Sequence, residues 1–371
     1  MTALRSTVAR LFGAFDGEIA GAPDADFTLA PQTVEDAARM LDLASEHGLK
    51  VLIWGGGTHQ GMGNLVEPDM LVATTALDRI VEWSPDDLTV VVEPGVPVDS
   101  LEERLADRQQ TAVLPERSAG ATVGGVVAAG VSGWRRHRYG PTRDRVLEVI
   151  VATGDGRIVK GGAQVVKNVT GYDIPRLMTG SLGSLGMIGR LCLKLWPRGA
   201  RAVTVEVDEP ARGIAGAYRP LAVLETGDGC RVYLAGTDRE VEAQAAGLGG
   251  TIRDGLDWPD PPSGEVVLSV RVPPALTTEA VGRLPAPGAF VAAHGVGVVV
   301  AGFAGIPPQA LGGLRSWAEA QGGAMVVTAR PEVFDLDPWG SPPESLALQR
   351  RIKAAFDPVG VMAPGRLPGG L

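Results

Sequence analysis

The sequence predicts an α+β protein with more than one domain, and three observations support this. Its 371 residues exceed what one compact core normally holds, so two domains are the first expectation. Glycines bunch at residues 55–63, 120–140 and 180–189, next to short buried strands. From about Arg201 alternating strand and helix patterns follow without such clusters, and no internal repeat is visible. We therefore expect one domain over residues 1–200 and a second over residues 201–330, the second an antiparallel sheet backed by helices.

Charge and cysteine content exclude several classes of protein. Lys and Arg number 34 against 43 Asp and Glu, and the resulting net charge of −9 argues against a general nucleic-acid binder. The two cysteines, Cys192 and Cys230, cannot build a disulfide framework or a cysteine-ligated metal cluster, which favours a reducing compartment. Residues 1–18 lack the apolar core of a signal peptide, and the apolar runs are too short to span a bilayer. We expect a cytoplasmic protein without a transmembrane segment.

Periodicity in the first half of the sequence predicts mainly short strands and only two helices. Residues 31–48 should form a helix, because Thr33 can cap it and Gly48 can end it. A second helix is expected over residues 98–109, and no periodic pattern is visible between Pro115 and Arg145. Strands are expected over residues 51–54, 71–73, 88–92, 146–152, 157–159 and 191–195, with a hairpin turn at 153–156.

In the second half the same reasoning predicts seven strands and five helices. The helices are expected over residues 211–217, 240–246, 278–284, 308–320 and 343–356. The strands are expected over residues 204–207, 221–224, 231–234, 266–272, 290–293, 296–301 and 325–328.

The first glycine cluster follows the predicted strand at residues 51–54. Three consecutive glycines, Gly55 to Gly57, allow backbone N–H groups to point into one concavity, which suits a diphosphate. Thr58, Gln60 and Asn64 could add side-chain donors. A flexible turn without a ligand explains the same glycines. The spacing does not match the Rossmann fingerprint, because no helical pattern follows at once.

The second cluster, residues 115–133, is rich in Gly, Ala and Ser. Small residues on this scale allow a large planar ligand to lie against the backbone, although a close contact between helices is an alternative. A branched side chain at Gly124 would then occupy ligand volume. Five arginines follow, which suit either a phosphate or partner site or a solvated loop face: Arg135, Arg136, Arg138, Arg143 and Arg145.

The third block combines residues 167–173 with the glycines at 180–189. Lys167, Tyr172 and Asp173 offer a cation, a phenol and a carboxylate, while turn formation explains Tyr172 and Asp173 equally well.

Together the three blocks resemble the FAD-binding domain of the vanillyl-alcohol oxidase and p-cresol methylhydroxylase family. The order is the same: a glycine-rich diphosphate loop, a Thr-Val-Gly-Gly segment at 122–125, a Tyr-Gly at 139–140 and a Gly-Ser-x-Gly-x-Leu-Gly block at 180–186. More narrowly, residues 167–173, 176–178, 356–360 and 364–366 resemble the E-subunit family of bacterial glycolate oxidases. The resemblance runs from about Asp24 to the C-terminus and is weakest between Arg201 and Arg330.

The resemblance implies an α+β fold with a two-subdomain FAD-binding domain of vanillyl-alcohol oxidase type and an α+β cap domain with an antiparallel sheet. Residues 331–371 would return to the FAD-binding domain. The diphosphate would be held by Trp54, Gly55, Gly56, Gly57, Thr58, His59, Gln60 and Asn64. The flavin and ribityl chain would be lined by Pro115, Gly120, Ala121, Thr122, Gly124, Gly125, Ala128, Gly130, Ser132, Gly133 and Gly140, and the adenine end by the backbone of Met187 and Ile188.

Departures from the family pattern bear on catalysis. Members that oxidise 2-hydroxy acids carry a histidine-rich metal and substrate site, whereas this chain has four histidines and only His294 falls in the cap. Val126 and Ala363 stand where those members commonly have Asn. No metal site and no catalytic residue is therefore predicted. FAD is expected to be non-covalent, because Thr58 separates His59 from the glycines and no cysteine occurs in residues 115–140.

The function expected from the resemblance is an FAD-binding subunit of a multi-subunit glycolate oxidase, which supports oxidation of glycolate to glyoxylate. Its partners would be a catalytic flavoprotein subunit and an iron–sulfur subunit, since two cysteines cannot ligate a cluster here. The complex would place it peripherally at the inner membrane. The alternatives are a scaffold subunit with a non-catalytic flavin site and a stand-alone flavin oxidase of a small hydroxy acid.

Overall fold

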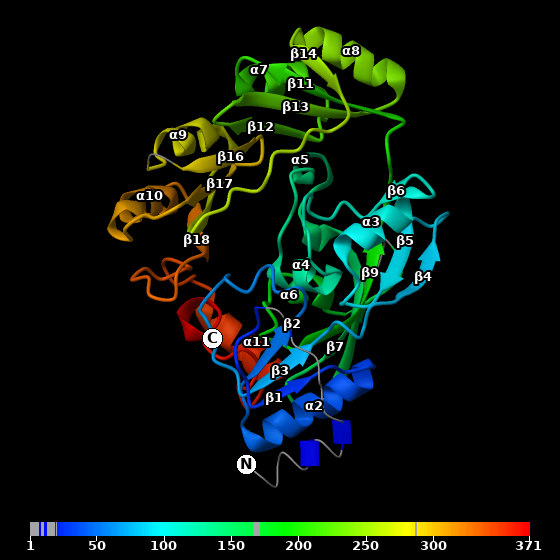
Figure 1. The fold of residues 1–371 in the computed structure, drawn as a ribbon, viewed down its shortest axis with the longest axis vertical. Helices are drawn as coiled ribbons and strands as arrows, with labels where there is room; N and C mark the ends of the chain where they lie inside the picture. The colour runs from blue at the N-terminus through cyan, green and yellow to red at the C-terminus, as the bar shows by residue number, and fades with distance from the viewer. Residues whose placement is uncertain (1–6, 9–10, 13–18, 20, 166–170, 286–287) are drawn as a thin grey trace.

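The computed structural model describes residues 7–8, 11–12, 19, 21–165, 171–285 and 288–371. Elements before residue 200 lie together with the C-terminal helix, and a large sheet from the later residues lies beside them (Figure 1). Within these described residues no helix has the length and apolar character needed to cross a bilayer.

A small parallel sheet carries the first glycine loop. Its strands are β1 (Phe27–Leu29), β2 (Val51–Trp54) and β3 (Met70–Ala73), in the order β1-β3-β2. Parallel strands need a crossover, which α2 (Val34–His47) provides. Because Gly55 follows β2 directly, the loop begins at the carboxyl end of the sheet, where ligands commonly bind in open α/β sheets.

A five-stranded antiparallel sheet forms the second part of the first domain. Its order is β4-β5-β9-β7-β8, and α3 and α4 cover it with apolar residues such as Leu101, Leu105 and Val126. The strands are β4 (Ile80–Ser84), β5 (Thr89–Val92), β7 (Val146–Ala152), β8 (Ile158–Gly162) and β9 (Met187–Lys194). The other elements are α3 (Val98–Ala106), α4 (Val123–Ala129), α5 (Arg136–Tyr139), η1 (Thr142–Asp144), α6 (Ile174–Met178) and the β6 (Gln110–Thr111) and β10 (Trp196–Pro197) pair.

The small-residue segment at 115–145 is not the unstructured loop that its lack of periodicity predicts, because it contains α4 and α5. Thr122 caps α4 by accepting a hydrogen bond from the Gly125 N–H at 3.2 Å. Val123, Val126 and Val127 are fully buried in the core. Glycine and valine are weak helix formers, so burial rather than intrinsic propensity holds this helix.

The cap domain is an eight-stranded antiparallel sheet built from two βαββαβ units. The sheet order is β14-β11-β13-β12-β16-β17-β15-β18, so the units meet along β12 and β16 and repeat the same order outward. The cap is therefore a structural duplication, although no repeat is visible in its sequence. The first unit is β11 (Arg201–Val207), α7 (Pro210–Gly216), β12 (Ala222–Thr226), β13 (Gly229–Gly236), α8 (Asp238–Leu248) and β14 (Thr251–Asp254). The second is β15 (Val266–Arg271), η2 (Pro274–Leu276), α9 (Thr277–Gly282), β16 (Ala289–His294), β17 (Val298–Phe303), α10 (Gln309–Ala320) and β18 (Ala324–Ala329).

The two faces of the cap sheet have different neighbours. Helices α7 to α10 cover the outer face, and the inner face is turned toward the first domain (Figure 1). Over β12, β13 and β16 that inner face packs against Trp134, just before α5, and Tyr139, the last residue of α5. The fold is thus the expected α+β arrangement of a flavin-type domain and an antiparallel cap.

The C-terminal segment returns to the first domain through α11 (Leu346–Phe356), before the short η3 (Pro368–Gly370). After α11 the chain runs beside β2: Val51 N donates to the Val361 carbonyl and Ala363 N donates to the Val51 carbonyl, both at 2.8 Å. The tail thereby continues the parallel sheet on its β2 side.

A buried ion pair fixes this return. The Lys353 Nζ donates to Asp357 Oδ2, to the Ser184 carbonyl and to the Met362 carbonyl, each at 2.6 to 2.7 Å. The Asp357 carboxylate also accepts from three backbone N–H groups, those of residues 360, 361 and 362. Burial lowers the pKa of Lys353, and the Asp357 carboxylate opposes that shift. The pair ties α11, the tail and the third glycine block to one another.

We predict that Asp357→Asn lowers the free energy of unfolding by roughly 3 kcal/mol, because it leaves Lys353 as a buried cation without its counter-charge. Glu279→Gln is the matched control: Glu279 forms an exposed i,i+4 pair with Arg283 and should cost less than about 0.5 kcal/mol. Urea unfolding of the apoprotein measures both. Equal midpoints for the two variants would contradict the structural role of the pair.

Candidate functional site

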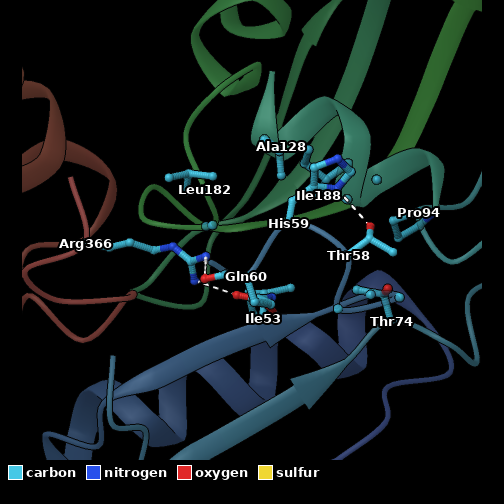
Figure 2. A pocket seen from close by; sticks show the side chains of 18 residues that line it. Ile53, Thr58, His59, Gln60, Thr74, Pro94, Ala128, Leu182, Ile188 and Arg366 are labelled. Atoms are coloured by element: carbon cyan, nitrogen blue, oxygen red, sulfur yellow. Dashed lines mark hydrogen bonds between the residues drawn. The ribbon is translucent and has the colours of Figure 1, made fainter. Parts of the chain in front are cut away.

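The first glycine loop, α4 and the third glycine block enclose one cavity, with about 610 Å³ of empty space that includes its open mouth. Figure 2 shows Ile53, Gln60 and Thr74 on its sheet side and Ala128 and Leu182 opposite them. Its residues are Ile53, Gly55, Gly56, Gly57, Thr58, His59, Gln60, Thr74, Pro94, Gly124, Gly125, Ala128, Ala129, Leu182, Gly183, Gly186, Ile188 and Arg366.

Glycines are required around this cavity for two different reasons, close packing of the protein and open space for a ligand. A Cβ at Gly56 would lie 1.7 Å from the Gly120 carbonyl oxygen, so the first and second loops touch only because residue 56 is a glycine. A Cβ at Gly124 would lie 2.4 Å from the Pro94 Cβ, so protein packing alone requires a glycine there. Gly183, with a φ of +76°, would meet only Ile53 at 3.5 Å, so its small size leaves space in the cavity.

Arg366 supplies a cation to this cavity. Only 4% of the residue is exposed, and its guanidinium donates to the Gln60 Oε1 at 2.7 Å and to the Gln60 carbonyl at 3.1 Å. Its Nε has no partner, and within the described part of the chain no carboxylate pairs with it. Burial lowers the pKa of Arg366 to about 10, so the side chain stays charged at neutral pH.

His59 lies where this cavity meets a second one. Its Nδ1 is 2.9 Å from the Thr58 hydroxyl, and burial lowers the pKa of the imidazole, so the ring is neutral at neutral pH. Thr58 and Ala129 also line both cavities. A ligand could therefore extend from one cavity into the other past these three residues.

The second cavity lies between the first domain and the inner face of the cap sheet, with about 1250 Å³ of empty space including its mouth. Its lower wall comes from the first two loops and its upper wall from β15 to β18 and the preceding connection. Its residues are Thr58, His59, Met62, Pro115, Glu116, Ala129, Gly130, Val131, Ser132, Gly133, Trp134, Arg136, Pro261, Pro262, Val267, Ser269, Arg271, Ala293, Val298, Val300, Thr328 and Ala329.

Two arginines, one from each domain, line this second cavity. Burial lowers the pKa of both Arg136 and Arg271, and the charge of Arg271 lowers that of Arg136 further. Among the described residues neither guanidinium forms an ion pair. Glu116 does not neutralise them, because its carboxylate is bound to Arg135 and to the Trp134 N–H.

The five-arginine cluster of the sequence does not form a single patch. Arg135 is bound to Glu116, and Arg138 donates to the Ala235 carbonyl of the cap at 2.6 Å. Arg145 is 1% exposed and donates to the Gly140 carbonyl at 2.7 Å, which is a structural role. Arg143 lies on the surface, 3.9 Å from Asp144. Neither a phosphate patch nor a solvated loop face describes the cluster, and only Arg136 enters the cavity.

Most of the residues predicted for the diphosphate and flavin line one of the two cavities. Gly55–Gln60, Gly124, Gly125, Ala128 and Ile188 line the first, while Pro115, Gly130, Ser132 and Gly133 line the second. Seven predicted residues line neither cavity: Trp54, Asn64, Gly120, Ala121, Thr122, Gly140 and Met187. Several of these support the loops instead; Asn64 Nδ2, for example, donates to the Gly365 carbonyl at 2.9 Å.

Only part of the third block lines a cavity. Gly183, Gly186 and Ile188 line the first cavity. Lys167 lies outside the described residues, Tyr172 is 90% exposed and Asp173 caps α6, so the described pair lies away from the cavities. The sequence reasoning missed Arg366 and Arg271. The Pro-Gly-Arg motif in the tail was a sequence signal for Arg366. Arg271 ends an ordinary strand, and no sequence signal marks it.

Comparison with known proteins identifies a family model and several partial relatives. Residues 25–162 match the FAD binding domain family. The chain is 32% identical over 201 residues to the glycolate oxidase subunit GlcD of Bacillus subtilis and 39% identical over 121 residues to the subunit GlcE of Escherichia coli. It is 31% identical over 169 residues to a D-lactate dehydrogenase of Archaeoglobus fulgidus. These matches cover 52%, 32% and 45% of this chain.

The matched regions span 42%, 35% and 38% of the three relatives, and they do not single out the E subunit. In fold, the chain is similar to an alkyldihydroxyacetonephosphate synthase, with a TM-score of 0.65 over 95% of this chain and 78% of that one at 15% identity. Residues 25–162 thus match an FAD-binding domain, and over part of its length the chain is similar to glycolate oxidase subunits and to a D-lactate dehydrogenase.

Proposed function

We propose that the chain is an FAD-linked oxidoreductase that oxidises a 2-hydroxy acid to the 2-oxo acid. The observation that carries this proposal is the pair Arg136 and Arg271, two guanidiniums without an ion-pair partner among the described residues, in the cavity that adjoins Thr58 and His59. Guanidinium groups are suited to binding carboxylates, often in a bidentate manner. The relatives named for glycolate and D-lactate support the same class of substrate.

The first cavity fits the FAD diphosphate. A buried cation without a carboxylate is unfavourable unless an anion pairs with it, and Arg366 is such a cation. The first glycine loop supplies backbone N–H groups beside it, with Thr58 and Gln60 as further polar groups. Residues around Pro115 and Gly133 would then face the flavin from the second cavity.

FAD held by the first glycine loop and Arg366 would supply the two-electron acceptor for the hydride of the carbinol carbon, and the hydroxyl proton would be released to solvent. The chain's own residues would hold the carboxylate through Arg136 and Arg271 and exclude water beneath the cap sheet. No metal is assigned to this step, since the described residues contain no group of three His, Cys, Asp or Glu side chains placed to hold one.

As narrower proposals, we infer that FAD is bound non-covalently and that the chain is the E-type subunit of a glycolate-oxidase-like complex. The partners would be a second flavoprotein and an iron–sulfur subunit that takes the electrons onward. Similarity to both GlcD and GlcE supports this assembly. Because this chain has only two cysteines, both buried, an iron–sulfur cluster would have to lie on another subunit. The location would be cytoplasmic, at the inner membrane only through the complex. The arginine pair counts against a purely structural scaffold.

We predict that Arg366→Gln weakens FAD binding by about 10- to 100-fold, because it removes a charge-assisted contact to the diphosphate. Titration of the apoprotein with FAD, followed by flavin fluorescence, measures the dissociation constant. Arg315→Gln is the matched control, because Arg315 is also a buried arginine whose Nε has no hydrogen-bond partner, but it lies on α10 in the cap. Equal affinity in the Arg366→Gln and wild-type proteins would contradict the diphosphate assignment.

Acid precipitation of the purified yellow protein should release all flavin into the supernatant. The reason is that Thr58 separates His59 from the glycines and holds its Nδ1 at 2.9 Å. Absorbance of the supernatant and the pellet at flavin wavelengths measures the outcome. Flavin retained by the pellet in the wild type but not in His59→Gln would show a covalent bond to His59 instead.

For substrate binding, Arg136→Gln and Arg271→Gln should each raise KM for the hydroxy acid by about 10-fold or more, through loss of a charged hydrogen bond. The lysine variants should recover part of this loss. Arg143→Gln is the control, because Arg143 is a surface arginine outside the cavity. The proposal fails if the cavity variants retain the KM of the control.

A further inference from the structure

The inner face of the cap sheet has an apolar wall that the proposed reaction does not explain. Side chains alternate along a strand, so β15 turns Val267, Ser269 and Arg271 toward the second cavity, while Val266 and Leu268 lie in the helix-covered core. The arginine is therefore at one end of a row whose other end is a valine.

Neighbouring strands continue the wall with small aliphatic residues. Val300 lies opposite Ser269 in the register of β15 and β17, and Val298 lies opposite Arg271. Ala293 and Ala329 are also part of the wall. Pro261 and Pro262, in the connection before β15, extend this wall, and Met62 and Trp134 line the cavity from the first domain. The cap-sheet side of the cavity away from Arg271 is therefore largely aliphatic, with Ser269 and Thr328 as its polar side chains.

The size of the cavity also favours a ligand larger than glycolate. Its volume of about 340 Å³ lies within the range of roughly 300–1,000 Å³ typical of small-molecule sites, so it can hold an acid larger than glycolate. Glycolate has no side chain, so with its carboxylate at the arginines it would leave the valine wall in contact with water.

We propose that the substrate is a 2-hydroxy acid with an apolar side chain, whose carboxylate binds Arg136 and Arg271 and whose side chain packs against Val267, Val298 and Val300. This inference rests on the proposed function and replaces glycolate as the preferred substrate. Removing apolar side-chain surface from water on both partners is the source of the preference.

The first test compares glycolate with the 2-hydroxy derivatives of butanoate, hexanoate and octanoate, using the flavin-loaded protein and an artificial electron acceptor. We expect kcat/KM to rise about fourfold for each methylene group that is buried. A kcat/KM for glycolate equal to or above that of the longer acids would overturn the inference while leaving the proposed oxidation intact.

A binding experiment separates the two claims. Butanoate, hexanoate and octanoate lack the hydroxyl group, cannot be oxidised in this way, and should perturb the spectrum of the bound flavin with increasing affinity. Tighter binding of longer acids without oxidation of any hydroxy acid would support the apolar subsite and overturn the proposed reaction. Equal affinity for all three acids would overturn the apolar subsite.

Variants locate the subsite. Val300→Phe and Val267→Phe introduce a larger side chain from two different strands. Each should reduce kcat/KM for the octanoate derivative at least 10-fold. The change in kcat/KM for the butanoate derivative should be smaller. Ile252→Phe on the exposed edge strand β14 is the control. If both cavity variants keep the chain-length profile of this control, the wall does not contact the substrate side chain.

Discussion

The Lys353–Asp357 pair is the contact on which the candidate cofactor site depends. It joins the C-terminal helix to the third glycine block and closes the turn that leads the tail along β2. Only because the tail follows β2 does Arg366 arrive beside Gln60, more than three hundred residues away in sequence. A buried ion pair with further hydrogen bonds to backbone groups gives such a return a defined geometry.

The charges of the site are opposite in sign to that of the whole protein. The chain has a net charge of −9, yet Arg366, Arg136 and Arg271 line the two adjoining cavities without a carboxylate partner among the described residues. Each is partly desolvated, which lowers its pKa and makes a bound anion more favourable. One cavity therefore suits a diphosphate and the other a carboxylate, with His59 between them.

Local patterns predicted most of the strands and helices, because capping residues and apolar periodicity act over short stretches. They failed at α4, where Gly124 and Gly125 argue against a helix and burial of Val126 and Val127 overrides that preference. They also missed β4, most of whose residues are exposed, and the duplication of the cap, which is visible only in the strand order.

The candidate site was predictable where glycines mark it. The loop at residues 55–60 follows a buried strand, and most of the small residues named from the resemblance line a cavity. Pairings between distant segments were not predictable. Nothing in the sequence around Arg271 indicates that β15 turns it toward Arg136, because that contact requires the cap sheet to cover the first domain.

The central claim is that this chain holds both the flavin and the hydroxy acid. The most direct measurement is anaerobic mixing of the purified, FAD-loaded chain with a 2-hydroxy acid, with flavin absorbance followed in a stopped-flow instrument. We predict bleaching of the flavin band by the isolated chain, at a rate that saturates with acid concentration and that Arg271→Gln slows at subsaturating acid. A flavin that stays oxidised in the isolated chain, and is bleached only when the partner subunits are present, would contradict the claim.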